Sequence, residues 1–296
     1  MLRELLVRTH IHSILLILAI PLQLSFAQQA ASLKEEEKCK PPEFPGELYA
    51  SLWIQTSGEY RAICLQTFRQ ALETVRRTAT SAPRIRTAAP VGPDSKPMAV
   101  VADLDETILD NSPYNVELQL QSEAAKRCFS EPTWNGWVKS NGKDTELVPG
   151  AGRFIQQVES LKVVMVYISN RPESLRNNTI KTLASLGVDV QGMESAQGLR
   201  LLLQTDQSAK ASRQRLVSER YHIVAFLGDN LGDFPGDFGR TAASRSQRAE
   251  ELDELWGTYW FVLPNPVYGT WERVLRENPI DHLRRASDKG FLNPAR

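Results

Sequence analysis

Polar residues that could take part in group transfer are concentrated in three short segments of this chain. The first offers two carboxylates spaced i and i+2, the second a hydroxyl close to a guanidinium, and the third two carboxylates spaced i and i+4. Carboxylate oxygens are hard donors, which suit Mg²⁺ better than a thiophilic metal. A carboxylate can also attack phosphorus, while a neighbouring carboxyl group holds a proton for the leaving oxygen. These residues are Asp103, Asp105, Ser169, Asn170, Arg171, Asp229 and Asp233.

Other kinds of site are excluded by composition and motif. The chain has only four histidines, and two of them, His10 and His12, lie in the extreme N-terminal segment, so a histidine-rich zinc site is excluded. No glycine-rich loop ending in Gly-Lys-Ser/Thr is present, which excludes a P-loop nucleotide site. Phosphoryl transfer also requires positive charge near the transferred group, and Lys210, at the start of the helix predicted over 209–220, can supply it.

Each polar segment directly follows an apolar run of the kind that forms a buried strand. Apolar runs at 98–102, 163–168, 223–227 and 259–263 alternate with helix-like stretches at 152–161, 172–186 and 209–220. This alternation predicts an α/β domain with a mostly parallel sheet. Ligands of such sheets bind beyond the carboxyl ends of the strands. Asp and Asn after a strand are commonly turn residues. Because that explanation would have to hold at three strand ends, we favour a functional site at this edge of the sheet.

Four longer segments contain these polar residues and Lys210, and two more lie before and after them: LWIQTSGEYRAICLQ (52–66), AVVADLDETILDNSPY (99–114), YISNRPE (167–173), DQSAKASR (206–213), FLGDNLGDF (226–234) and LPNPVYGTWE (263–272). Together they resemble the class C (subfamily IIIB) acid phosphatases of the haloacid-dehalogenase superfamily, the lipoprotein e family of secreted 5′-nucleotidases. The resemblance covers about residues 48 to 276. It implies a Rossmann-like core with a small helical cap, dependence on Mg²⁺, and hydrolysis of phosphomonoesters at acid to neutral pH.

By matching position, the resemblance implies a role for each site residue. Asp103 would be the nucleophile and a Mg²⁺ ligand, and Asp105 would be the general acid/base and a ligand through its backbone carbonyl. Asp229 would complete the protein ligands of the metal. The family often has lysine where Gln207 stands, and the charge-balancing role is assigned to Lys210. Ser169 would bind the phosphoryl oxygens, Asp233 and Thr107 would support the site, and Asn170, Arg171, Trp53, Tyr268 and Trp271 would contact the substrate.

The substrate and the outcome of the reaction leave alternatives open. The aromatic side chains could stack on a nucleobase or simply pack in the protein interior. A nucleoside monophosphate is the favoured substrate, and sugar phosphates are the alternative. A non-catalytic ligand- or haem-binding relative and a phosphotransferase are further alternatives, although the nucleophile and all its partner motifs are present. The family also suggests a homodimer.

The N-terminus has the layout of a secretory signal. Arg3 and Arg8 precede an apolar run at 14–20, and small residues at 25–27 predict cleavage after Ala27. An uncleaved anchor is the alternative, but Pro21 interrupts a run that is too short to span a membrane. We therefore expect a periplasmic or extracellular protein. Thirty-five basic and 35 acidic residues balance, which gives no bulk charge for binding a nucleic-acid polymer.

The same patterns predict how the chain is divided. Three cysteines, Cys39, Cys64 and Cys128, are too few for a disulfide scaffold, and their pairing stays open. The predicted divisions are a signal peptide (1–27), a flexible linker (28–47), an N-terminal helical segment that contributes to the cap (48–94), a phosphatase core (95–276) with a cap insertion at about 111–149, and a C-terminal tail (277–296).

Overall fold

A computed structural model describes residues 46–82, 90, 92–121, 129–140, 144–206 and 208–275. The predicted signal peptide, most of the predicted linker and the C-terminal tail lie outside the described residues, as do Cys39, Cys128 and Gln207. Cys64 lies on a described helix, where it is a buried free thiol. Within the described ranges, no helix combines the length and the apolar character needed to cross a membrane.

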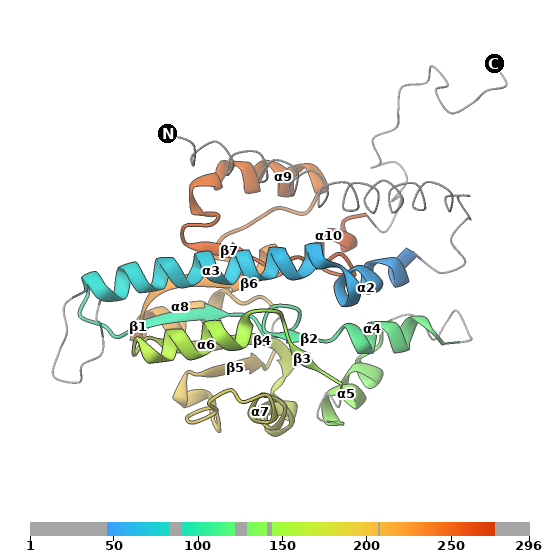
Figure 1. Ribbon diagram of the computed structural model, residues 1–296, viewed down its shortest axis with the longest axis horizontal. Helices are drawn as coiled ribbons and strands as arrows, with labels where there is room; N and C mark the ends of the chain where they lie inside the picture. Colours follow the sequence, from blue (N-terminus) through green and yellow to red (C-terminus); the bar gives the residue numbers. More distant parts are fainter. Residues whose placement is uncertain are drawn as a thin grey trace, which may run out of the picture. The chain divides into compact units, whose positions relative to one another are not determined.

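A five-stranded parallel sheet forms the centre of the fold, in the order β5-β4-β1-β6-β7 (Figure 1). This confirms the predicted α/β class. The short strand β5 was not predicted, and β4 continues through Ser169 and Arg171, so this polar segment lies inside a strand and not after it. The strands are β1 (Met98–Ala102), β4 (Val164–Pro172), β5 (Leu201–Gln204), β6 (His222–Gly228) and β7 (Trp260–Val262).

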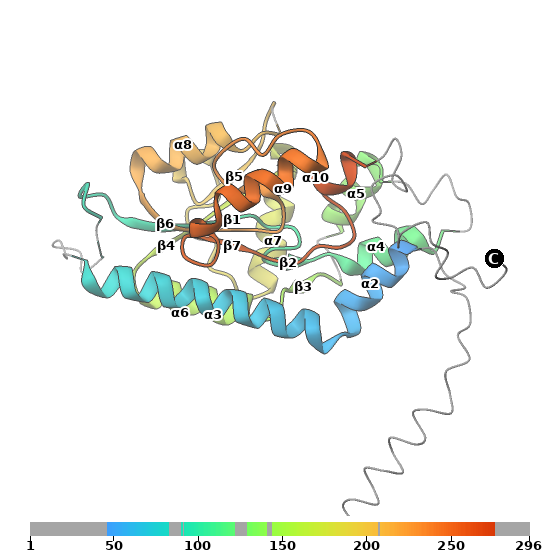
Figure 2. The same ribbon diagram turned by 90° about the horizontal axis from the view of Figure 1, so that it is seen from above.

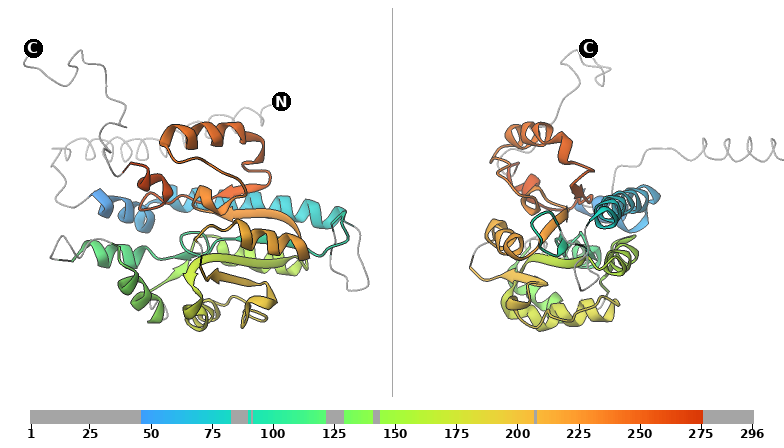
Figure 3. Two further views of the ribbon diagram at one scale, coloured as in Figure 1. Left: turned by 180° about the vertical axis from the view of Figure 1, so that it is seen from behind. Right: turned by 90° about the vertical axis from the view of Figure 1, so that its left-hand side faces the viewer.

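Helices cover both faces of the sheet, which explains why its strands are apolar without alternation. The helices α3 (Gly58–Ser81) and α6 (Ala151–Ser160) lie on one side, and α8 (Ala211–Arg220) lies on the other (Figure 2). All five residues of β1 are buried. Met98, Val100 and Ala102 join the hydrophobic cluster on the α3 side, whereas Ala99 and Val101 join the cluster on the α8 side. Figure 3 shows the same layers end on.

The N-terminal helical pattern forms two helices. The helix α2 (Gly46–Thr56) ends before Ser57, whose side chain accepts a hydrogen bond from the Tyr60 backbone N–H and caps α3. Buried residues recur along α3 at three- and four-residue steps, and Phe68 packs against Phe154 of α6 with the ring centroids 5.3 Å apart. The helix α3 therefore packs on the sheet layer, while α2 contacts α4.

The segment between β1 and β4 contains a small antiparallel hairpin and two short helices. These elements are β2 (Leu109–Asp110), α4 (Ser112–Gln119), α5 (Glu131–Lys139) and β3 (Glu146–Leu147). The Tyr114 ring on α4 packs against Trp134 and Trp137 of α5, with centroids 5.1 and 5.9 Å away. The two helices are thus joined by aromatic packing.

The remaining elements connect the strands at the periphery. The helix α7 (Arg176–Ser185) follows the 3₁₀ turn η2 (Glu173–Leu175), so the predicted helix at 172–186 is split in two. The helix α9 (Ala242–Glu251) buries none of its residues, as expected for a charged surface helix. The other short elements are η3 (Ala196–Gly198), η4 (Leu231–Asp233), η5 (Asp253–Leu255) and α10 (Thr270–Arg273).

Candidate active site

Strand register brings the three polar segments to one edge of the sheet. Ala102 at the end of β1 pairs with Tyr167 of β4 and with Leu227 of β6. The backbone N–H of Asp103 then donates to the Leu227 carbonyl at 3.0 Å, which holds the first segment beside β6. Since all these strands are parallel, their carboxyl ends meet at one place. The segments that meet there are those around Asp103, Ser169 and Asp229.

Lys210 lies between two aspartates at this edge. Its Nζ forms ion pairs with Asp103 Oδ1 and, at 2.7 Å, with Asp233 Oδ1. Lys210 is 6% exposed and Asp103 is 8% exposed, so solvent screens the pair little. Burial lowers the pKa of Lys210, but the charges of Asp103 and Asp233 raise it by more, so its pKa is higher than usual. The ammonium group therefore stays charged beside Asp103.

Three carboxylates here fit a divalent cation. One oxygen from each of Asp103, Asp229 and Asp233 lies within 4.8 Å of the others. Burial, with added repulsion from Asp233, raises the pKa of Asp229 to about 7, and burial likewise raises the pKa of Asp103 well above its usual value. A bound dication would relieve this repulsion, and hard oxygen donors suit Mg²⁺. Asp233, which was expected to support the metal site, lies in this cluster with the predicted ligands Asp103 and Asp229.

Hydrogen bonds fix both oxygens of Asp229. Thr107 Oγ1 donates to Oδ1 at 3.2 Å, and Asn265 Nδ2 donates to Oδ2 at 2.9 Å. Thr107 is fully buried in the loop after β1, as expected of a residue that supports the site. Asn265 comes from the loop after β7, which sequence analysis connected only with substrate contacts.

Asp105 is held by a guanidinium, an amide and a hydroxyl. Arg171 Nε and Nη2 donate to Asp105 Oδ1 at 3.0 and 2.7 Å. Asn111 Nδ2 donates to the same oxygen at 2.9 Å, and Ser169 Oγ donates to Oδ2 at 3.3 Å. Arg171 was expected to contact the substrate, and here its main partner is Asp105. Its Nη1 is buried without a hydrogen-bond partner in the described part of the chain. Trp134 packs over the guanidinium, with its ring centroid 5.6 Å from Arg171 Cζ.

A second buried arginine supports the β4 segment. Arg213 on α8 donates from Nη1 to the Ser169 carbonyl at 2.6 Å and from Nη2 to Asn170 Oδ1 at 2.7 Å. Asn170 is exposed at the rim of the site. Because guanidinium donors point in fixed directions, Arg213 orients the Ser169 carbonyl and the Asn170 side chain.

Glu106 connects the loop after β1 to the late loop. Its side chain is buried, its backbone adopts the left-handed region with φ +60°, and its Oε1 accepts a hydrogen bond from the Asn111 N–H at 3.2 Å. Tyr268 donates its hydroxyl to Oε2. Burial raises the pKa of Glu106 well above the usual range, and the charge of Asp105 raises it further. Tyr268 is thus fixed next to the carboxylate segment.

The two tryptophans expected to contact the substrate lie in different surroundings. Trp271 is 39% exposed on α10, and its Nε1 donates to the Tyr268 carbonyl at 3.2 Å, so it lies on the same late loop. Trp53 on α2 packs edge-on against Tyr60, with the ring centroids 5.5 Å apart, and is partly buried against the hydrophobic core. Among the described residues, no hydrogen bond or ring contact connects Trp53 with the carboxylate cluster.

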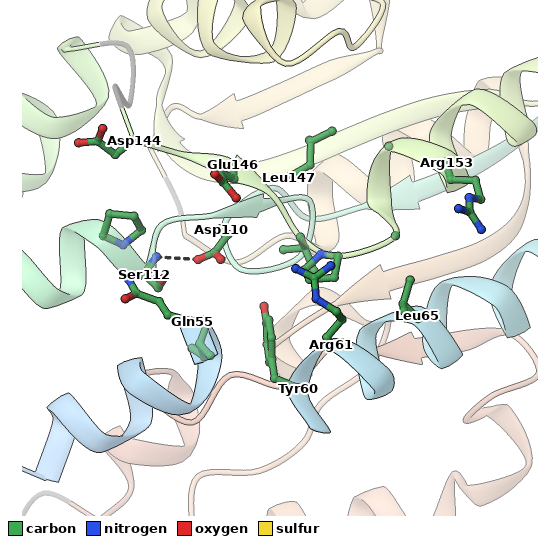
Figure 4. A pocket seen from close by; sticks show the side chains of 16 residues that line it. Gln55, Tyr60, Arg61, Leu65, Asp110, Ser112, Asp144, Glu146, Leu147 and Arg153 are labelled. Carbon is green, nitrogen blue, oxygen red and sulfur yellow. Dashed lines mark hydrogen bonds between the residues drawn. The ribbon is translucent and has the colours of Figure 1, made fainter. Parts of the chain in front are cut away.

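A cavity of about 730 Å³ lies between the N-terminal helices and the β2–β3 hairpin (Figure 4). Tyr60 and Arg61 of α3 point toward Asp110 on its opposite wall (Figure 4). None of its lining residues belongs to the carboxylate cluster, so the cavity is separate from the candidate active site.

Comparison with known proteins decides the family. A family model for the haloacid-dehalogenase superfamily, subfamily IIIB (acid phosphatase), matches residues 34–271. This chain belongs to that family. The enzyme is similar to two solved structures of the class C acid phosphatase from Bacillus anthracis. One, with tungstate bound, is 32% identical and has a TM-score of 0.66, covering 82% of this chain and 91% of that chain. The other is 30% identical and has a TM-score of 0.69, covering 81% of this chain and 97% of that chain.

Because the chain belongs to subfamily IIIB, the enzyme is an acid phosphatase that acts on phosphomonoesters. Four residues that hold its candidate site received no role from sequence analysis, although all lie in or beside the recognised motifs: Glu106, Asn111, Arg213 and Asn265. Their positions beside the motifs were a signal, but nothing local in the sequence revealed their partners.

Proposed function

We propose that this acid phosphatase forms an aspartyl phosphate on Asp103. A carboxylate oxygen of Asp103 attacks phosphorus, a new P–O bond forms, and the P–O bond to the leaving group breaks. The leaving oxygen takes a proton from Asp105. The single observation that carries the proposal is the buried ion pair of Lys210 with Asp103 beside Asp229, in a chain of this family.

Hydrolysis of the intermediate returns both carboxyl groups to their starting states. Asp105, now a carboxylate, takes a proton from a water molecule whose oxygen attacks phosphorus. The bond from phosphorus to Asp103 then breaks, which releases inorganic phosphate and frees the carboxylate. Arg171 and Ser169 orient Asp105 for both proton transfers.

We further propose Mg²⁺ as the cofactor, held by Asp103, Asp229 and the Asp105 backbone carbonyl with Asp233 nearby. The metal, when bound, neutralises negative charge on the phosphoryl oxygens and the carboxylates. Lys210 supplies a second positive charge from the protein, and the buried Ser169 hydroxyl lies next to Asp105, where it would bind the phosphoryl oxygens.

A nucleoside 5′-monophosphate is the proposed substrate. The family resemblance supports this choice, as does the position of Tyr268 and Trp271 on one loop next to the carboxylate segment. An aromatic face holds a base at about 1–3 kcal/mol without reading its identity.

The test is phosphate release from 5′-AMP, nicotinamide mononucleotide and p-nitrophenyl phosphate, with Mg²⁺ or with EDTA. Wild type is compared with Asp103→Asn and with Asp253→Asn, a matched change at an exposed carboxylate far along the chain. We expect turnover that needs Mg²⁺, falls at least about 10³-fold in Asp103→Asn and is unchanged in Asp253→Asn. Turnover on p-nitrophenyl phosphate alone would contradict the nucleotide proposal. Turnover that survives in Asp103→Asn would contradict the mechanism.

We also propose export after cleavage behind Ala27, based on the basic residues, the apolar run and the small residues of the N-terminus. Mass spectrometry of the enzyme from the culture medium or the periplasm tests this directly. A mature chain that begins at Gln28 is expected, and an enzyme retained in the cytoplasm with its first 27 residues would contradict it.

A further inference from the structure

The Asn265 side chain makes hydrogen bonds at both of its ends. Its Oδ1 accepts from the backbone N–H groups of Val267 at 3.0 Å and Tyr268 at 3.4 Å. Because these groups are donors, the oxygen of the amide must face them. The NH₂ end therefore faces Asp229, where it donates to Oδ2 at 2.9 Å. A turn in the backbone thus fixes which end of the amide meets the carboxylate.

Asp229 depends on this amide because the nearby ammonium group of Lys210 pairs with other carboxylates. Lys210 pairs with Asp103 and Asp233. In the described ranges, the only side chains that donate hydrogen bonds to Asp229 are Thr107 and Asn265, one to each oxygen. A neutral donor can orient the carboxylate without neutralising it, which leaves its charge available to a cation.

The loop that carries Asn265 is itself anchored to the end of β6. The Leu263 N–H donates to the Gly228 carbonyl at 2.9 Å, next to Asp229 in the chain. Thr270 Oγ1 donates to Asn230 Oδ1 at 2.5 Å on the other side of Asp229. The two ends of the loop are therefore held on either side of the residue that Asn265 contacts.

We infer that Asn265 is a positioning residue, which orients Asp229 to bind Mg²⁺. This inference rests on the proposed function, since it assumes that Asp229 is a metal ligand. Outer partners that hydrogen-bond to ligating carboxylates commonly change metal affinity by 10- to 100-fold when they are removed.

The experiment measures Mg²⁺ affinity of the metal-free enzyme by calorimetric titration, independently of turnover. Asn265→Ala removes both ends of the amide. Asn265→Ser leaves a hydroxyl that can accept from the turn but is too short to reach Asp229. Asn177→Ala is the matched control, because it truncates an exposed asparagine on α7, away from this loop. Asp229→Asn tests the proposed metal site itself, and the melting temperature of each metal-free variant monitors its folding.

We expect Asn265→Ala and Asn265→Ser to bind Mg²⁺ about 10- to 100-fold more weakly than wild type, and Asn177→Ala to bind within about threefold. Wild-type affinity in Asn265→Ser would overturn the inference, because the amide would then act only through the turn. Wild-type affinity in both Asn265 variants, with binding lost in Asp229→Asn, would overturn the inference alone. Failure of wild type to bind Mg²⁺, or unchanged binding in Asp229→Asn, would overturn the proposed metal site as well.

Discussion

Arg171 shows how a single side chain can determine the geometry of the site. Two of its nitrogens contact Asp105, and the side chain is almost fully buried beneath Trp134. Because the guanidinium is planar, it fixes the orientation of the carboxylate as well as its distance. A lysine would keep the charge but lose that orientation.

We therefore predict that Arg171→Lys lowers kcat about 10²-fold, the size of effect produced when a reacting group is misplaced by about 1 Å. The measurement is steady-state hydrolysis of p-nitrophenyl phosphate at saturating Mg²⁺. Arg215→Lys, at an exposed position on α8, is the control and should keep wild-type kcat. Equal kcat values for the two variants would argue against orientation of Asp105 by Arg171.

At the scale of elements, close approach between the end of β6 and the turn η4 decides the position of Asp233. A Cβ added at Gly228 would lie 2.3 Å from the Asp233 Cβ and 2.6 Å from its Oδ2. Asp233 Oδ2 also accepts from the Asn230 N–H at 2.9 Å, which closes the turn. Only glycine lets the strand pass so close to the partner of Lys210.

Gly228→Ala should destabilise the enzyme by about 1–3 kcal/mol, the usual cost of overpacking. Gly136→Ala is a control with the opposite expected sign. Gly136 is exposed on α5 with no atom within 4 Å of an added Cβ, so the change should stabilise by about 0.4–1 kcal/mol. Urea unfolding measures both free energies, and a neutral Gly228→Ala would contradict the packing argument.

The contact of Tyr268 with Glu106 joins two elements that are 162 positions apart in the chain. Tyr268→Phe leaves the buried carboxyl group without this donor and should cost about 1–3 kcal/mol of unfolding free energy. In the double variant with Glu106→Gln, the costs should be less than additive, because both changes remove the same contact. Urea unfolding of the four proteins completes the cycle. Additive costs would show that the contact contributes nothing.

At the scale of the whole molecule, the buried acids link stability to pH and to metal. Burial raises the pKa of Asp229 from 3.8 to about 7 and raises those of Asp103 and Glu106 in the same direction. The folded metal-free enzyme therefore holds protons that the unfolded chain releases near pH 4. The contribution of Asp229 to stability is therefore highest below pH 4 and is lost as the pH rises through about 7.

Mg²⁺ should reverse this loss where the carboxylates are ionised. We predict that the rise in melting temperature caused by Mg²⁺ is small at pH 5 and grows through pH 7 to pH 8, because metal binding competes with protons. At 100 times the dissociation constant, the gain corresponds to about 2.7 kcal/mol. Thermal unfolding across this pH range, with and without Mg²⁺, measures it. A gain independent of pH would mean that the raised carboxyl pKa values have no part in metal binding.

The α/β class and four of the five strands of the sheet could be predicted, because continuous apolar runs are a local signal of strands buried on both faces. The strand β5 was missed since it has only four residues, LLLQ, of which three are apolar. The helical pattern predicted for the N-terminal segment is divided at Ser57, whose hydroxyl caps the second of its two helices.

The segments that carry the chemistry could be located from the amino-acid sequence, because polar motifs next to apolar strands are short-range patterns. Which side chains contact one another depends on the folded arrangement of distant segments. The tertiary structure pairs Arg171 with Asp105, Asn265 with Asp229 and Tyr268 with Glu106. Each of these contacts joins residues at least 36 positions apart. Such contacts depend on strand register and on how loops pack over the sheet edge, which no local run of residues specifies.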